Sequence, residues 1–260
     1  MSSAPSPFQT LCAIAKGYLP RLWQGRGWSL AAITVLPIAL ITTTVLLARR
    51  YEDVPVSAGL TVFHQAFVPF LLPILSMLAA PAGLREDMEQ RTIPLMLVRP
   101  AFIPILPFGK GLLWFGWGAL WLLVATLFLL AFGTSLETVL QLQLALLAAY
   151  WAQLGFMSLL TLVFKRGVLW GALFFFGWDP LVRIFPTNLP RLTFLHYIES
   201  IAGSRGGGVN SLQLLAQDQI TTPVWLAVLV LFLVGATCWA ACGFKLWTTP
   251  IGLAGREAEG

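Results

Sequence analysis

Long hydrophobic runs separated by short polar segments dominate this chain of 260 residues. An α-helix rises about 1.5 Å per residue, so about 20 apolar residues cross a hydrocarbon core about 30 Å thick. Six runs come close to or exceed that length: 28–47, 63–82, 111–133, 139–164, 167–185 and 223–247. Because lipid offers backbone groups no hydrogen-bond partners, and because these runs lack the alternation of barrel strands, we expect them to be helices. The pattern predicts an all-α membrane protein whose six transmembrane helices occupy residues 28–247.

The segment before the first run, residues 1–27, has a helical pattern of its own. Its apolar side chains recur three or four residues apart, at Phe8, Leu11, Ala15, Leu19 and Leu22. Lys16 and Arg21 fall elsewhere on the helical wheel, so the helix has one apolar face suited to lying along the inner membrane surface. Gly17 and Pro20 weaken such a helix, and a disordered basic leader is the alternative.

Charge is concentrated in the connection between the second and third runs, residues 83–110. Its charged residues are Arg85, Glu86, Asp87, Glu89, Arg91, Arg99 and Lys110. Acids near the start of residues 84–91 favour a short helix, Pro94 interrupts it, and residues 95–98 form a second, apolar piece. We expect both pieces to run along the inner membrane face, where they can pass force between a soluble partner and the neighbouring helices. The alternative is that the charges only fix topology and contact lipid head groups, although acids do not help head-group binding.

The overall composition agrees with a membrane protein, since 58% of the residues are hydrophobic and 10% are charged, against about 25% charged in soluble domains. Basic residues concentrate on the cytoplasmic side of membrane proteins. With both termini inside, that side holds most of the 16 Lys and Arg residues, and the tail 248–260 is cytoplasmic. Arg49 and Arg50, directly after the first run, contradict the rule locally. This distribution along membrane borders explains the formal net charge of +5 better than nucleic-acid binding does.

A second unusual region is the outer segment 179–222, between the fifth and sixth runs. Asp179 and Pro180 interrupt the fifth run beyond the expected membrane midplane, where a carboxylate needs a partner. Arg183 lies four residues later and would be that partner on a continuous helix. Alternatively, the helix breaks near Gly177 and the segment folds back as short re-entrant helices over the outer half of the bundle. We favour the second interpretation because the segment is too long for a simple hairpin loop.

The sequence contains no catalytic or metal-binding pattern. His64 and His196 are far apart and lack neighbours at metal-ligand spacing. We expect His64 and Gln65 to cap or line the outer end of the second helix, with a substrate contact as the alternative. Gln153 belongs to a polar side of the fourth helix, which serves packing or, alternatively, lines a path. Apart from Asp179, no carboxylate or lysine lies well inside a run, so a proton relay or an ion-coupled transporter lacks the residues it requires.

The string REDMEQRTIPLMLVRP, followed by Gly109 and Lys110, resembles the motif between the second and third helices of ABC-2 type transporter permeases. The matching positions are Glu86, Asp87, Glu89, Arg91, Thr92, Leu95, Leu97, Arg99, Pro100, Gly109 and Lys110. Six helices, an interfacial N-terminal helix and a long fifth-to-sixth connection are similar to that family's plan over nearly the whole chain. One departure is that Ala101, Phe102 and Ile103 replace the basic residue often found after the Arg-Pro pair, so the contact of that residue does not carry over.

The resemblance implies that residues 83–110 carry a coupling helix that docks in a groove of a separate ABC ATPase. The docking residues it implies are Arg85, Glu86, Asp87, Glu89, Arg91, Thr92 and Arg99. Because the chain has no GxxxxGK[ST] nucleotide-binding motif, we expect no enzyme activity and no cofactor in this chain, with ATP and Mg²⁺ bound by the partner. Two permease halves imply a homodimer or a pairing with a sister permease.

The function implied by this resemblance is export of a hydrophobic or amphipathic compound across a bacterial cytoplasmic (inner) membrane by alternating access. The candidate residues of the translocation path or its outer cap are His64, Gln65, Gln153, Asp179 and Arg183. Two alternatives stay open. One is an ATPase-linked permease that relays force to an envelope-assembly partner without moving a free solute, and the other is a membrane scaffold with no ATPase.

Overall fold

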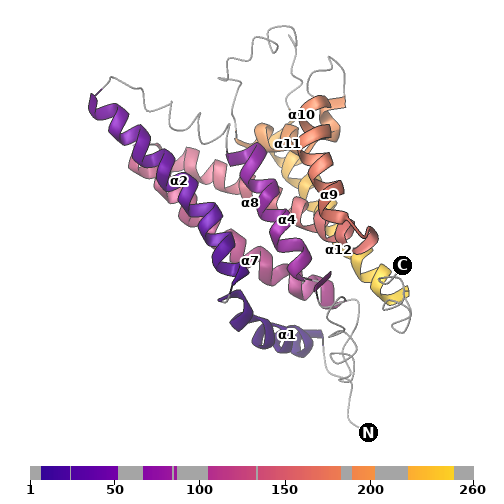
Figure 1. Ribbon diagram of the computed structural model, residues 1–260. Coiled ribbons are helices and arrows are strands. Elements are labelled where there is room, and N and C mark those ends of the chain that lie inside the picture. Colours follow the sequence, from indigo (N-terminus) through magenta and orange to yellow (C-terminus); the bar gives the residue numbers. More distant parts are fainter. Residues whose placement is uncertain are drawn as a thin grey trace.

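The computed structural model describes residues 7–23, 25–51, 67–83, 85–86, 105–132, 134–182, 189–202 and 222–248. Within these ranges every regular element is helical (Figure 1). The α-helices are α1 (Pro7–Leu22), α2 (Arg26–Tyr51), α4 (Leu72–Gly83), α7 (Ile105–Leu127), α8 (Leu136–Val163), α9 (Gly167–Ala172), α10 (Asp179–Val182), α11 (Phe194–Ala202) and α12 (Val224–Thr248). The π-helices are η1 (Phe67–Leu71) and η3 (Leu173–Trp178), and the 3₁₀ helices are η2 (Phe128–Phe132) and η4 (Leu189–Leu192). The predicted all-α class is confirmed for the part of the chain that the structure describes.

Four of the described helices are long and apolar enough to cross a membrane, which identifies a multi-pass membrane protein by helix length and composition. Their apolar stretches are Gly27–Ala48, Leu106–Leu130, Leu136–Val163 and Val224–Thr248. They agree with four of the six predicted runs. However, α7 begins at Ile105 and not at residue 111, so Gly109 and Lys110 belong to the helix and not to the connection. Pro107 does not prevent this early start, because a proline is tolerated in the first helical turn, where its missing N–H has no intrahelical acceptor.

Within the described residues, the other two predicted runs contain the shorter apolar helices Val68–Pro81 and Gly167–Val182. Residues 63–66 and 183–185 of these runs lie outside the described ranges. The described parts are shorter than the roughly 20 residues that cross a bilayer core, so the count of six spans stays a prediction. The break expected near Gly177 is wrong, because helical structure continues through η3 and α10 to Val182. The wider π-helical turn of η3 is the local adjustment that lets Pro180 follow without ending the helix.

Helix α1 lies within the predicted N-terminal segment 1–27, with Pro20 inside its last turn. Its predicted position at the membrane interface stays a prediction. It packs on α7 and lies beneath the long helices, at the opposite end of the molecule from α10 and α11 (Figure 1). Ile14 and Leu22 are buried against the bundle, whereas Phe8 and Leu19 stay exposed. The apolar stripe is therefore divided between a face that packs on protein and a face suited to lipid.

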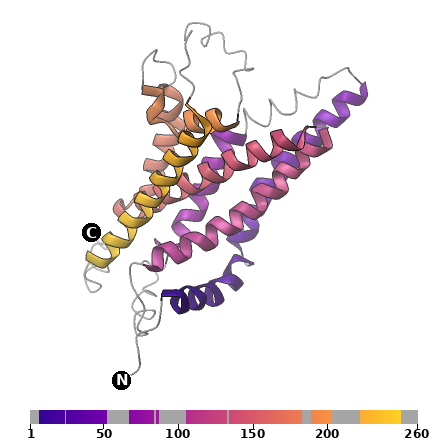
Figure 2. The same ribbon diagram turned by 180° about the vertical axis from the view of Figure 1, so that it is seen from behind.

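Helix α8 is the central element, in contact with α12, α4, α11 and α7 (Figure 2). Its fully buried small residues include Ala145, Ala149 and Ala152. Small residues let helix backbones approach closely in a membrane. At the crossing with α12, a Cβ on Gly155 would lie 3.0 Å from the carbonyl oxygen of Gly235. The Trp151 indole covers Gly235, and its Nε1 donates a 3.3 Å hydrogen bond to the carbonyl oxygen of Phe232.

Replacing Gly235 by Ala should destabilise this crossing, because the added methyl group would overlap the Trp151 indole ring. Overpacking of this kind costs about 1–3 kcal/mol, which lowers the melting temperature by several degrees. Gly116→Ala on α7 is the matched control, since a Cβ there meets nothing within 4 Å. Thermal unfolding of the two variants in detergent provides the measurement, and equal melting temperatures would contradict this packing.

Candidate functional site

The charged connection, residues 84–104 between α4 and α7, is described only at its start. Arg85 and Glu86 form a short helical piece after α4, and both side chains are partly buried. The other predicted docking residues, Asp87, Glu89, Arg91, Thr92 and Arg99, lie outside the described residues. The structure therefore shows Arg85 and Glu86 after α4 and the start of α7 at Ile105.

Arg85 turns back onto the bundle. Its Nη1 donates a 3.0 Å hydrogen bond to the carbonyl oxygen of Phe164. Phe164 is the C-cap of α8, and the last carbonyl groups of a helix lack intrahelical partners and attract cations. The sequence predicts Arg85 as a residue that meets a partner protein, whereas the structure shows its guanidinium on this chain's own α8. No spacing rule connects two residues so distant in the chain, so this contact had no signature in the sequence.

The start of α7 is fastened to α1. Lys110 is 1% exposed, and its Nζ lies 4.5 Å from the centroid of the Tyr18 ring. The preceding Gly109 allows close approach, because a Cβ there would lie 2.9 Å from Leu11 Cδ2 and 3.1 Å from Ile14 Cδ1. A cation over an aromatic ring contributes about 0.5–2 kcal/mol. The Gly109–Lys110 pair therefore attaches α1 to the helix into which the charged connection runs.

A group of tryptophans joins the α1–α2 corner to α7, and the sequence pattern did not single it out as a group. Ring centroids lie 5.3 Å apart for Trp23 and Trp117, and 6.2 Å apart for Trp28 and Trp121. Trp117 Nε1 also donates a 3.0 Å hydrogen bond to the Gly27 carbonyl oxygen. The spacing of Trp117 and Trp121 places both on one helix face, but it does not indicate what that face meets.

At the opposite end of the bundle, Asp179 opens α10 and is 5% exposed. A carboxylate buried in this way needs interactions within the protein, as the sequence predicts. Its predicted partner Arg183 lies outside the described residues, as do His64 and Gln65. The roles of these three residues stay predictions.

Part of the predicted outer segment 179–222 is a short helix packed on the bundle. Helix α11 contacts α8 and α12, and the Phe194 ring centroid lies 5.7 Å from that of Phe156 in α8. The His196 Nε2 is 2.9 Å from Thr222 Oγ1, which ties α11 to the start of α12. A short helix is what the sequence predicts here, whereas its role as a cap over a path stays a prediction.

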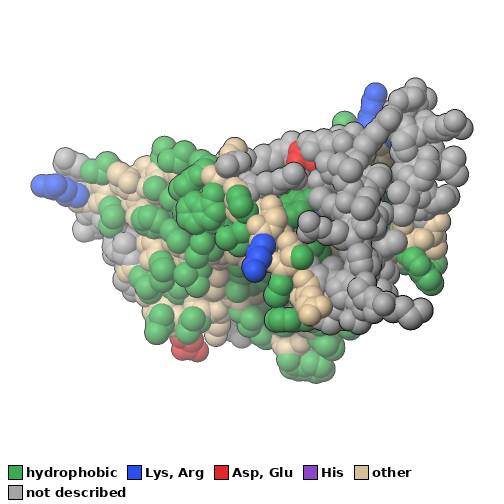
Figure 3. Space-filling view, turned by 90° about the horizontal axis from the view of Figure 1, so that it is seen from below, with side chains coloured by type: hydrophobic (Ala, Val, Ile, Leu, Met, Phe, Trp, Pro, Cys, Tyr) green, Lys and Arg blue, Asp and Glu red, His purple; other side chains and the backbone are tan. Residues whose placement is uncertain are grey.

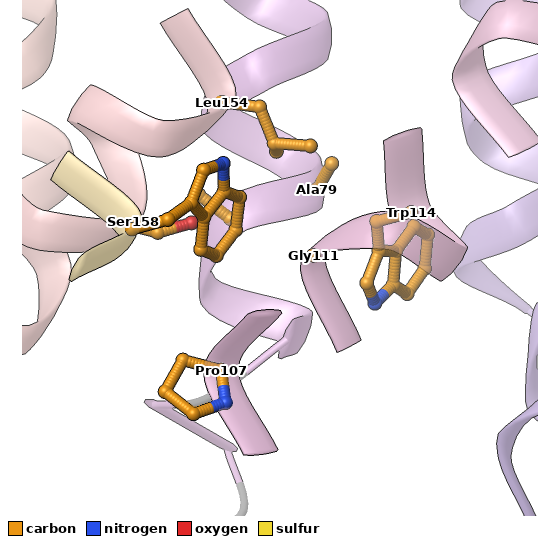
Figure 4. Close-up of a pocket in the computed structure, with 8 residues that line it drawn as sticks. Ala79, Pro107, Gly111, Trp114, Leu154 and Ser158 are labelled. Atoms are coloured by element: carbon orange, nitrogen blue, oxygen red, sulfur yellow. The ribbon is translucent and has the colours of Figure 1, made fainter. Parts of the chain in front are cut away.

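Gln153, the remaining path candidate, is 1% exposed within α8, and its Oε1 has no hydrogen-bond partner among the described residues. A small pocket nearby lies between α4, α7, α8 and α12 (Figure 4). It is lined by Ala79, Ala80, Pro107, Gly111, Trp114, Leu154, Ser158 and Trp239. Because this pocket does not admit a water molecule, it is a packing gap and not a substrate chamber. Across the described ranges, no group of three or more His, Cys, Asp or Glu residues is placed to hold a metal ion.

Hydrophobic side chains cover much of the described surface in the view from below (Figure 3). Lys and Arg side chains in that view lie apart from one another. Large apolar side chains are exposed along α12, among them Trp225, Phe232, Phe244 and Trp247. An apolar surface of this extent is a liability in water, but it suits helices surrounded by lipid.

No protein-family model, curated protein or solved structure matches this chain.

Replacing Tyr18 by Leu should loosen α1 from α7, because the buried Lys110 ammonium loses the aromatic face it contacts. Loss of about 1–2 kcal/mol corresponds to roughly 5- to 30-fold faster amide exchange across α1. Hydrogen–deuterium exchange of the protein in lipid nanodiscs measures the effect. Phe8→Leu, which changes an exposed aromatic side chain on the same helix, should leave exchange unaltered. Unchanged protection in the Tyr18 variant would show that this contact does not anchor α1.

Proposed function

We propose that this chain is the permease subunit of an ATP-driven transporter whose ATPase is a separate polypeptide. In this proposal six helices cross a bacterial cytoplasmic membrane with both termini inside, and the charged connection docks on the ATPase. The partner binds ATP and Mg²⁺, and two permease chains, identical or sister, form the path. The cargo is a hydrophobic or amphipathic compound, which moves outward by alternating access.

One observation carries this proposal: the chain on either side of the charged connection is attached to other parts of the bundle. At its start, Arg85 is hydrogen-bonded to the end of α8. Just beyond its end, Gly109 and Lys110 hold α1 against α7. A partner that displaces this acid-containing segment would therefore move α4, α7, α8 and α1. An element that transmits force from a soluble subunit needs attachments of this kind, because packed helices shift as rigid bodies.

The distribution of charge along the described spans supports an energy source outside the chain. In the four long apolar helices the Lys and Glu residues lie near helix ends: Lys110 in the second turn of α7, Glu137 in the first turn of α8 and Lys245 in the last turn of α12. Asp179 lies near the end of the shorter apolar segment Gly167–Val182. Transporters driven by protons or ions instead place ionisable groups near the middle of the membrane. ATP hydrolysis in a partner subunit supplies energy without such groups.

A second candidate is a permease that relays force to an envelope-assembly partner and moves no free solute. The Figure 4 pocket is closely packed and offers no chamber for a solute, and a permease that only relays force needs none. Substrate-stimulated ATP hydrolysis by the reconstituted assembly would distinguish transport from force relay. A membrane scaffold, the third candidate, would have no ATPase bound at all.

Replacing Glu86 and Asp87 together by Lys should release the ATPase and leave the helices inserted, because both acids lie in the charged connection and outside the long spans. Co-purification of the ATPase with the tagged chain in mild detergent measures docking. We expect at least a tenfold loss of bound partner, which corresponds to about 1.4 kcal/mol.

Glu137→Lys is the matched control, since it reverses an exposed acid in the first turn of α8, far along that helix from Phe164. It should retain the ATPase. Full retention by the double variant would exclude docking at Glu86 and Asp87. An intact assembly without any nucleotide-hydrolysing companion would refute the proposed function as a whole.

A further inference from the structure

We infer that Arg85 is a positioning residue that latches the charged connection to the end of α8, so that movement of the connection is passed to α8 and α9. The mechanical role of this latch rests on the proposed function. The contact itself lies within this chain and can be tested without a partner.

The Phe164 carbonyl oxygen is the acceptor that the latch uses. It receives Arg85 Nη1 at 3.0 Å and the Gly167 N–H at 3.1 Å. The Phe164 N–H in turn donates to the Leu160 carbonyl oxygen at 2.9 Å. A carbonyl oxygen has two lone pairs, so these two donors satisfy it fully. Arg85 thereby completes the hydrogen bonding of the turn that joins α8 to α9.

The turn between α8 and α9 is closely packed against α8. A Cβ on Gly167 would overlap the backbone of Leu160 and Thr161, and a Cβ on Gly171 would overlap the side chain of Met157. Helix α9 therefore folds directly back along α8 without space between them. Interfaces packed to this density do not deform gradually, so we expect α8 and α9 to move as one hairpin.

Helix α4 and this hairpin contact each other at both ends. At the α1 end, Arg85 lies two residues after the end of α4 and donates a hydrogen bond to the Phe164 carbonyl oxygen. At the opposite end, Phe70 of η1, which opens the same helical segment, stacks on Phe176 of η3 with ring centroids 6.2 Å apart. Helix α4 also packs along α8 between these two contacts. Of the two, the Arg85 hydrogen bond is the one next to the charged connection. Loss of this hydrogen bond would weaken the coupling between the start of the connection and the turn that joins α8 to α9.

Arg166 offers a matched control on the same turn. It is exposed and precedes α9, but its side chain makes no capping hydrogen bond to that helix. Arg166→Gln therefore removes the same charge from the same surface and leaves the Phe164 carbonyl contact in place.

Hydrogen–deuterium exchange of the full chain in lipid nanodiscs tests the latch directly. Arg85→Gln should raise exchange at the Phe164 and Gly167 amides about fivefold or more, because the turn opens more often. Arg85→Lys retains a charged donor and should restore much of the protection, and Arg166→Gln should change nothing. Protection in the middle of α8 shows that each variant is folded. Unchanged exchange in a folded Arg85→Gln variant would overturn the latch.

The assembly with its ATPase separates a latch from a docking contact. For a latch, Arg85→Gln keeps the ATPase bound within about twofold, but the stimulation of ATP hydrolysis by the permease falls about tenfold, and Arg85→Lys restores it. Release of the ATPase by Arg85→Gln would assign Arg85 to docking and overturn the latch, while it would uphold the proposed function. An assembly that contains no ATPase would refute the proposed function, and the exchange experiment would then decide the latch by itself.

Discussion

Neighbouring helices pack closely against α8, and this packing determines the positions of the other helices in the bundle. In lipid the hydrophobic effect does not draw helices together, so close packing and a few polar contacts hold them in place. Gly155 and Gly235 permit the approach of α12, and the Tyr150 hydroxyl donates a 3.2 Å hydrogen bond to the Trp114 carbonyl oxygen of α7. Helices α4 and α11 pack on the remaining faces of α8. Helix α8 therefore positions α4, α7, α11 and α12 directly, and it positions α1 through α7.

Some polar side chains among the described residues contact another element near the end of a helix. Trp117 donates to the Gly27 carbonyl oxygen at the start of α2, and Arg85 donates to the Phe164 carbonyl oxygen just after α8. Carbonyl groups at the C-terminal end of a helix have no partners within their own helix, so the Phe164 carbonyl oxygen is available to Arg85. The Gly27 carbonyl lies in the first turn of α2, where a carbonyl can also accept within the helix, and its second lone pair is available to Trp117. A chain with only 10% charged residues can therefore still fix neighbouring elements through specific side-chain hydrogen bonds.

Hydropathy was enough to locate α2, α7, α8 and α12, because crossing a bilayer imposes a length and a composition that few other structures share. Periodicity located α1 for a similar reason. The start of α7 was misplaced because Lys110 looks like a connection residue until Tyr18 is known to lie beside it. The continuation past Gly177 required a π-helical turn, for which the sequence has no simple signature. The contact of Arg85 with Phe164 depends on tertiary packing, which spacing alone does not report.

These internal uses of charge change what the connection offers to a partner. Counted from the sequence, residues 83–110 contain four basic residues and three acids. Arg85 donates a hydrogen bond to the Phe164 carbonyl oxygen, and Lys110 is buried in α7 over Tyr18, so both bases are engaged within the chain. Without these two bases, the sequence of the connection contains three acids and two bases, and the acids come first in the chain. In the proposed docking role, this small excess of acids in a protein of formal net charge +5 would favour a basic groove on the partner.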